Sequence, residues 1–149
     1  MSHTLCEVYL HLVFSCKNHR PFLRPEWKAE LYRYMGGTLR HLGVAPIIIG
    51  GSIDHVHILC RIGAESQISA FVRKLKISSS SWIKAKFDQE FSWQGGYGIF
   101  SVSKSQLMAV ESYVAHQDEH HKHKSFAEEM REIMQALGLA DSPDVSMFD

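Results

Sequence analysis

The run of residues 54–62, DHVHILCRI, constrains the fold of this chain more than any other stretch. It is rich in apolar residues, it alternates with a period of two, and the turn sequence Gly-Gly-Ser at 50–52 precedes it. This pattern predicts a β-strand, on which residues i and i+2 point to the same face of the sheet. We therefore expect the side chains of His55 and His57 to project from one face together with Leu59.

Two neighbouring imidazoles on one face can converge on a divalent metal ion or on a phosphate group. A histidine pair on a half-exposed strand can also have no chemical role, because short motifs recur by chance. The functional interpretation gains support from Tyr113 and Gln117, which are four residues apart in a segment predicted to be helical. Their side chains would then lie one turn apart on one helix face, flanked by His116 and His120.

Length and composition favour one globular domain. The chain has 149 residues, of which 45% are hydrophobic, enough for one domain with a core and too few for two. We expect a single domain over residues 1–149, with its core in residues 5–137 and a loose acidic tail at 139–149. No apolar run has the length of a membrane-spanning helix, and the N-terminus lacks a signal-peptide pattern, so we expect no membrane association. The three cysteines form no CxxC pair, which favours reduced thiols and a cytoplasmic location.

Charge is distributed unevenly along the chain, although the net charge is zero. One basic and six acidic residues follow position 124, which leaves 15 basic and 10 acidic residues in positions 1–124. A mildly basic body permits binding to phosphate groups without requiring it. The candidate DNA-binding side chains are Lys17 and Arg20 in a loop after the first strand, and Arg73, Lys74 and Lys76 on the second helix. Each of these side chains is more often simply part of a solvated surface.

Hydrophobic periodicity predicts the element order β-α-β-β-α-β followed by two helices. The predicted strands cover residues 5–16, 44–49, 54–62 and 99–103, and the predicted helices cover residues 25–42, 67–87, 104–121 and 125–137. The first six elements match the ferredoxin-like split βαβ plan, an α+β class with an antiparallel sheet. Strands one and three are neighbours in that plan, so His11 would lie beside His55 and His57. Two helices would cover one face of the sheet, and the additional helix with Tyr113, or a ligand, would cover the other.

The chemistry that suits these side chains is phosphoryl transfer. A divalent cation held by two neutral imidazoles and an amide oxygen can polarise a phosphodiester. The oxygen of Tyr113 can then attack in line and become covalently bound to phosphate. Because the reference pKa of tyrosine is about 10, the metal ion must help to activate this nucleophile. Tyr113 could instead be an ordinary residue of an amphipathic helix, with its ring buried and its hydroxyl in water.

Three segments together resemble the single-tyrosine HUH transposases of small bacterial insertion sequences, including relatives of the REP-associated tyrosine transposases. These segments are DHVHIL at 54–59, FSWQGGYGIFSVS at 91–103 and YVAHQDEHHKHKSFAEE at 113–129. The resemblance extends from about residue 5 to about residue 137. The histidine pair alone is weakly specific, but its combination with a tyrosine helix that carries glutamine four residues later is strongly specific.

This resemblance implies a DNA transposase that works on single strands. His55, His57 and Gln117 would bind Mg²⁺ or Mn²⁺, and Tyr113 would cut single-stranded DNA to leave a 5′-phosphotyrosine link and a free 3′-OH. A second 3′-OH could reverse the attack and join ends without ATP. Members of the family form homodimers and recognise imperfect DNA hairpins, so the expected partners are a second copy of the chain and single-stranded DNA with hairpin ends.

Three further residues are candidates for orienting the metal ligands, namely His11, Asp54 and His116. Asp54 could equally do no more than begin the strand. Two other functions remain open at this point. A histidine-triad-like nucleotide hydrolase would need a third alternating histidine, and position 59 is leucine. A non-catalytic module that binds single-stranded DNA or RNA would stack bases on aromatic side chains of an open sheet, and the strand at 54–62 offers none on the histidine face.

Overall fold

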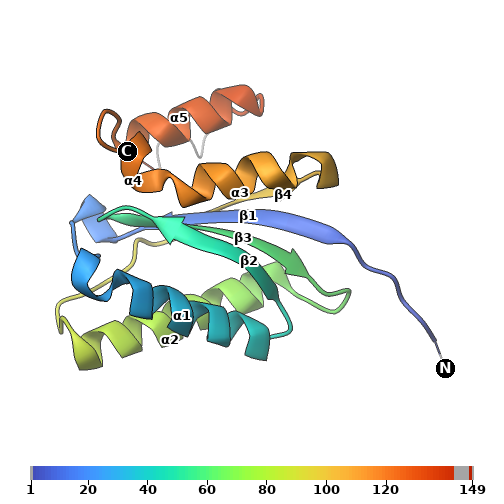
Figure 1. Cartoon of the computed structure of the whole chain (residues 1–149), viewed down its shortest axis with the longest axis horizontal. Coiled ribbons are helices and arrows are strands. Elements are labelled where there is room, and N and C mark those ends of the chain that lie inside the picture. The colour runs from blue at the N-terminus through green and yellow to red at the C-terminus, as the bar shows by residue number, and fades with distance from the viewer. Residues whose placement is uncertain (1, 143–147, 149) are drawn as a thin grey trace.

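The computed structural model of the chain describes residues 2–142 and 148. A four-stranded antiparallel sheet forms its middle layer, with α1 and α2 on one face and α3, α4 and α5 on the other (Figure 1). The strands are β1 (Val8–Ser15), β2 (Ala45–Gly51), β3 (His55–Ile62) and β4 (Gly98–Val102). The helices are α1 (Pro25–His41), α2 (Ile68–Lys86), α3 (Leu107–Ala115), α4 (Gln117–His120) and α5 (Phe126–Ala136). Within the described residues, no helix is long and apolar enough to cross a membrane.

The strand order is β2-β3-β1-β4, which is the order of the ferredoxin-like plan. The predicted α+β class is therefore confirmed, together with the central pairing of the first and third strands. In the β1–β3 ladder, Leu12 lies opposite Ile58 and His11 lies opposite Leu59. Strands β2 and β3 form the expected antiparallel hairpin, with an irregularity between Pro46 and Ile48. Proline is tolerated there because β2 is an edge strand, where a missing N–H donor can face away from the ladder.

The larger core lies between the sheet and the first two helices. Alternate residues of β1 and β3 face it, since side chains of a strand alternate between the two faces. Trp93, from the segment before β4, packs with its ring nearly perpendicular to those of Phe14 and Phe91. The indole N–H of Trp93 donates to the hydroxyl of Ser79 at 3.0 Å, and that hydroxyl donates to the carbonyl oxygen of Leu75 at 2.7 Å. Helix α2 carries four consecutive serines at 78–81. Ser79 is the fully buried one, and it allows close packing against Trp93.

A smaller core fixes α5 over the opposite face of the sheet. Phe126, Met130 and Met134 recur every four residues along one side of α5, and all three are buried with Val13 of β1. Ser125 begins this helix as predicted, because its hydroxyl accepts the backbone N–H of Glu128 at 3.2 Å. Phe148, within the segment predicted to be a loose tail, is buried in the same cluster. Residues 143–147 and 149 of that predicted tail lie outside the described residues.

The prediction of one continuous helix over residues 104–121 is wrong. The segment comprises a short 3₁₀ turn (Lys104–Gln106), then α3, then α4, with a break at His116 where φ is −106° and ψ is 25°. The side-chain amide of Gln117 donates to the carbonyl oxygen of Tyr113 at 3.4 Å, and His116 Nδ1 lies 2.7 Å from the carbonyl oxygen of Ser112. These side-chain contacts partner carbonyl groups at the helix end and so make the break inexpensive. The break directs the side chain of Gln117 toward the sheet, where it is buried.

Gly50 sets how closely α3 can approach the sheet. A methyl group at this position would overlap the carbonyl oxygen of Val114 on α3. We expect Gly50→Ala to lower the free energy of unfolding by about 1–3 kcal/mol, because the helix must move away from an overpacked contact. Urea denaturation measures this change. Gly37→Ala is the matched control: it lies on α1 with open space around it, so it should raise stability by up to about 1 kcal/mol. Equal effects of the two substitutions would contradict the close approach.

Candidate metal and tyrosine site

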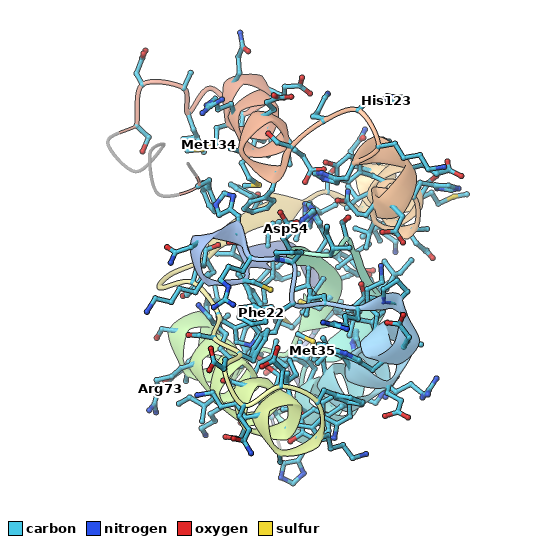
Figure 2. All side chains as sticks on the ribbon, turned by 90° about the vertical axis from the view of Figure 1, so that its left-hand side faces the viewer. Phe22, Met35, Asp54, Arg73, His123 and Met134 are labelled. Atoms are coloured by element: carbon cyan, nitrogen blue, oxygen red, sulfur yellow. The ribbon has the colours of Figure 1, made fainter. Side chains whose placement is uncertain are left out.

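His55 and His57 project from β3 toward α3, α4 and α5, and both side chains are fully buried. Each ring has its Nδ1 occupied by a neighbour. His57 Nδ1 lies 2.7 Å from Nε2 of His11 on β1, and His55 Nδ1 lies 2.7 Å from Oδ1 of Asp54. Because a partner at Nδ1 fixes the orientation of an imidazole, the Nε2 atoms of both rings are directed at the space beneath the helices. In Figure 2, Asp54 lies at this boundary between the sheet and the upper helical layer.

Gln117 closes one side of this space. Its Oε1 lies 2.9 Å from Nε2 of His55, and the amide is oriented by its contact with the carbonyl oxygen of Tyr113. With His55 donating its Nδ1–H to Asp54, Nε2 of the neutral ring carries a lone pair that faces the amide oxygen. Two acceptor atoms at this distance repel each other unless a cation lies beside both, or a proton lies between them. This pair of atoms is therefore suited to a bound metal ion.

Tyr113 lies on the same side of the sheet, one turn before Gln117. Its half-buried ring centroid is 5.6 Å from that of His57 and 5.0 Å from that of His120. Tyr113 lines the same pocket as Glu129 of α5. The structure thus brings together four of the predicted residues, His55, His57, Tyr113 and Gln117, and it adds His11 and Asp54 behind the histidines.

Sequence reasoning missed two residues of the site, Glu129 and His121. One oxygen of Glu129 lies 2.7 Å from Nε2 of His57 and 3.8 Å from Nε2 of His55, and the other oxygen lies 2.7 Å from Nε2 of His121. A signal for Glu129 was present, because it falls three residues after Phe126 and beside Met130 on the apolar side of α5. His121 gave no such signal, since the helix break changes which of the histidines at 116, 120, 121 and 123 face the sheet.

Burial keeps His11 and His57 neutral. Burial, together with the neighbouring His57 ring, lowers the pKa of His11 to about 3. Burial also lowers the pKa of His57 to about 4, although the hydrogen bond to Glu129 acts in the opposite direction. Both rings are therefore uncharged near neutral pH, which is the form that can ligate a metal ion.

The pKa values of Glu129 and Tyr113 are shifted in opposite directions. Burial opposes ionisation of Glu129, but hydrogen bonds from His121 and His57 outweigh it and hold the pKa of the carboxyl below its ordinary value. Burial raises the pKa of Tyr113 well above its ordinary value, and the negative charge of Glu129 raises it further. The site therefore holds a carboxylate beside a phenol that keeps its proton, so this phenol needs nearby positive charge to act as a nucleophile.

The donor atoms fit a divalent cation. Imidazole nitrogens, an amide oxygen and a carboxylate oxygen converge here with separations of 2.7 to 3.8 Å along the measured contacts. Adjacent ligands of an octahedral ion with bonds of about 2.1 Å are about 3 Å apart. The ligating atoms of His55, His121 and Glu129 also lie within 4.8 Å of one another. The arrangement can bind a metal ion next to a tyrosine oxygen, which is a setting for phosphoryl transfer.

A pocket of about 240 Å³ leads from the surface to this site. It lies between α3, α4 and α5, and its lining includes Tyr113, His120, Lys124, Glu129 and Glu132. His120 and Glu132 are exposed, so the pocket connects the buried phenol with solvent. A phosphate group of a substrate has space to approach Tyr113 along this route.

Several predicted site residues lie elsewhere. His116 is exposed and bonds back to its own helix, and the structure does not bring it to the histidine pair. Lys17 and Arg20 are exposed near the end of β1. Arg73 and Lys74 are exposed on α2. Figure 2 shows Arg73 in the layer of α1 and α2, on the side of the sheet away from Asp54.

Lys76, the remaining predicted DNA-binding residue, is a half-buried structural residue. Its ammonium group donates to the carbonyl oxygens of Gln94 at 2.7 Å and Gly96 at 2.6 Å, and it lies over the ring of Phe14. Burial lowers the pKa of Lys76 to about 8. These contacts hold the loop before β4 against α2 and leave little of the side chain for a ligand.

Residues 4–117 match the family described as IS200-like transposases. The match covers most of the chain and includes the histidine pair, Tyr113 and Gln117. The chain belongs to this family. The family predicted from the three sequence segments is thereby confirmed, and the protein is a transposase, an enzyme class that cuts and joins DNA.

Individual relatives agree with the family assignment. The IS200-like chain is 28% identical over 134 residues to the transposases for insertion sequence element IS200 of Salmonella typhimurium and Salmonella typhi, covering 82% of this chain and 84% of each relative. It is similar in structure to a putative transposase from Deinococcus radiodurans, with a TM-score of 0.65 and 19% identity over 79% of this chain and 96% of that one. A REP-associated tyrosine transposase, solved bound to a REP hairpin, gives a TM-score of 0.63 with 12% identity over 81% of this chain and 72% of that one. These two structures share the fold of the IS200-like chain.

Proposed function

We propose that this IS200-like transposase cuts and rejoins single-stranded DNA through a covalent link between Tyr113 and a 5′-phosphate, with a divalent metal ion at His55, His57 and Gln117. The observation that carries the proposal is the position of Tyr113, whose ring centroid lies 5.6 Å from that of His57 and whose carbonyl oxygen accepts from the Gln117 amide one turn later. No other tyrosine of the described residues contacts these ligands. The surface pocket at Tyr113 gives a DNA phosphate a route to the same point.

Each residue of the site has a distinct task in this mechanism. His55, His57 and Gln117 hold the ion, while Asp54 and His11 fix the two rings from behind through their Nδ1 atoms. When bound, Mg²⁺ or Mn²⁺ supplies positive charge that polarises the phosphodiester and favours ionisation of the phenol. Burial keeps water away from His11, His55, His57 and Gln117, which strengthens the electrostatic interactions among them.

The cleavage step exchanges one phosphate ester for another. The oxygen of Tyr113 forms a bond to phosphorus as the bond from phosphorus to the 3′ oxygen of the preceding nucleotide breaks. The phenol gives up its proton, and the departing oxygen takes up a proton to become a 3′-OH. Because the new link is also a phosphate ester, attack by another 3′-OH regenerates the tyrosine and joins DNA ends without ATP.

The partners follow from the same proposal. The similar REP-associated transposase was solved with a REP hairpin, and we propose that this chain likewise recognises a DNA hairpin at the ends of its element. We propose a homodimer as the active form, which light scattering of the purified chain can test. Three free thiols and a DNA substrate fit a cytoplasmic location.

The test uses labelled single-stranded oligonucleotides that cover the candidate hairpins flanking the coding sequence. Incubation with the full chain and Mn²⁺, followed by a denaturing gel, should give a slow band of covalently linked protein and DNA. A chelator should remove this band, and added Mn²⁺ or Mg²⁺ should restore it. A covalent band that persists in chelator, or hairpin binding with no covalent band at any metal concentration, would show that the proposed mechanism is wrong.

A further inference from the structure

A carboxylate from outside the family-matched segment reaches the histidine pair. The match ends at residue 117, whereas Glu129 lies on α5, twelve residues further along the chain. The apolar contacts of Phe126, Met130 and Met134 fix α5 over the sheet and leave the side chain of Glu129 3% exposed. Burying a carboxylate is costly unless it is paired, so a position this buried calls for partners of positive charge or strong donors.

The partners of Glu129 are the same atoms that would hold the metal ion. Its Oε1 lies 2.7 Å from Nε2 of His57 and 3.8 Å from Nε2 of His55, the two nitrogens that face the space beneath the helices. Its Oε2 lies 2.7 Å from Nε2 of His121. One oxygen is thus directed at the proposed ion position, and the other is held in place from the side.

We propose that Glu129 is a fourth protein ligand of the metal ion, bound through Oε1, and that His121 is the positioning residue that holds its Oε2. This inference rests on the proposed function, since it requires the ion at His55, His57 and Gln117. With Glu129 included, four side chains would hold the ion, which would supply positive charge to a phosphate group approaching Tyr113. The pocket lined by Tyr113 and Glu129 gives such a phosphate group access.

Binding of the ion requires a proton rearrangement that the neighbours allow. In the ion-free site, neutral His57 donates its Nε2–H to Glu129, so its Nδ1 accepts from His11. With the ion present, Nε2 must carry the lone pair, and the proton of His57 belongs on Nδ1, directed at Nε2 of His11. His11 can accept it as the Nδ1–H tautomer. The His11–His57 contact therefore serves both states with its direction reversed.

The carboxylate changes the charge of the ligand set. Two imidazoles and an amide oxygen are neutral ligands. Glu129 would add one negative charge, which offsets part of the double positive charge of the bound ion. Affinity for hard divalent cations rises with the number of charged oxygen ligands. A carboxylate oxygen beside imidazoles also suits Mn²⁺ and Mg²⁺ better than imidazoles alone, which favour later first-row ions.

The experiment measures Mn²⁺ binding to the full chain without DNA, from the electron paramagnetic resonance signal of free Mn²⁺. Glu129→Gln keeps the size of the side chain and removes its charge, and Glu128→Gln removes a charge from the exposed neighbouring position. We expect Glu129→Gln to weaken Mn²⁺ binding by at least about tenfold and Glu128→Gln to leave it within about twofold of wild type. Mn²⁺ affinity in Glu129→Gln equal to or tighter than wild type would overturn the inference, since Glu129 would then compete with the ion.

A third variant separates failure of this inference from failure of the proposed function. His55→Ala should abolish Mn²⁺ binding if the ion lies at the histidine pair. Wild-type Mn²⁺ binding in His55→Ala would place the ion elsewhere and contradict both the proposed metal site and the ligand role of Glu129. Loss of binding in His55→Ala with full binding in Glu129→Gln would contradict only the ligand role of Glu129. If Glu129→Gln does not fold, Glu129→Asp keeps the charge but withdraws it by one methylene, and it should weaken Mn²⁺ binding at least about threefold. Unchanged affinity in a folded Glu129→Asp would contradict the assignment.

Discussion

Replacing Tyr113 with phenylalanine is expected to abolish the covalent protein–DNA band while leaving the fold and hairpin binding intact. The substitution removes one oxygen and keeps the ring, whose contacts with His57 and His120 involve the ring faces and edges. Loss of a catalytic nucleophile lowers a rate by about 10⁴-fold or more, which is below detection on a denaturing gel. A native gel shift with the same oligonucleotide measures hairpin binding separately.

Tyr34→Phe is the matched control for this experiment. Tyr34 stacks on Trp82 in the opposite helical layer, so removal of its hydroxyl leaves the site unchanged. This variant should form the covalent band at the wild-type rate. A covalent band in Tyr113→Phe would show that another side chain attacks the DNA, and loss of hairpin binding in Tyr113→Phe would mean that the hydroxyl contributes to recognition.

The sheet and the face of the histidine pair could be predicted because a strand has a strict period of two. Apolar residues at 56, 58 and 60 had to enter the main core, so His55 and His57 had to face the other way. The order of elements then placed His11 next to them, and its Nε2 does contact His57. These are local rules with one consistent solution.

Contacts between distant segments could not be predicted in the same way. The helix break at His116 depends on where the side chain of Gln117 finds partners, and helical periodicity carries no information about that. The docking of Glu129 depends on the angle at which α5 crosses the sheet. An acidic residue on an apolar helix stripe was the available signal, and it indicates a buried charge without naming its partner.

The covering of the second sheet face also bears on the alternative functions. A single-strand-binding module of this fold reads bases on an open sheet. Here the corresponding side chains lie beneath the helices: His11 is 7% exposed, and His55 and His57 are fully buried. A nucleic acid therefore cannot stack on this face, and the pocket at Tyr113 remains as the approach to the site. This arrangement favours chemistry at a phosphate over readout of bases.

Replacing His57 with alanine is expected to lower metal-dependent cleavage by at least about 10²–10³-fold, because it removes a proposed metal ligand at the centre of the site. The same change leaves Oε1 of Glu129 and Nε2 of His11 without the ring that partners them. Loss of one partner from a buried hydrogen-bonded charge costs about 3–5 kcal/mol of stability. His116→Ala is the matched control, since His116 is exposed on the same layer and contacts only its own helix. It should leave cleavage unchanged and lower stability by no more than about 1 kcal/mol, because it removes one exposed hydrogen bond at the helix end.

Stability measured with and without Mn²⁺ separates the two effects of His57→Ala. A ligand present at 100 times its dissociation constant stabilises the folded state by about 2.7 kcal/mol. Wild type and His116→Ala should both gain this increment in urea denaturation, while His57→Ala should gain none. If His57→Ala were stabilised by Mn²⁺ as strongly as wild type, the ion would bind away from β3, and the loss of cleavage would reflect packing alone. Stabilisation confined to the two chains that keep His57 would tie metal binding, and with it cleavage, to this ring.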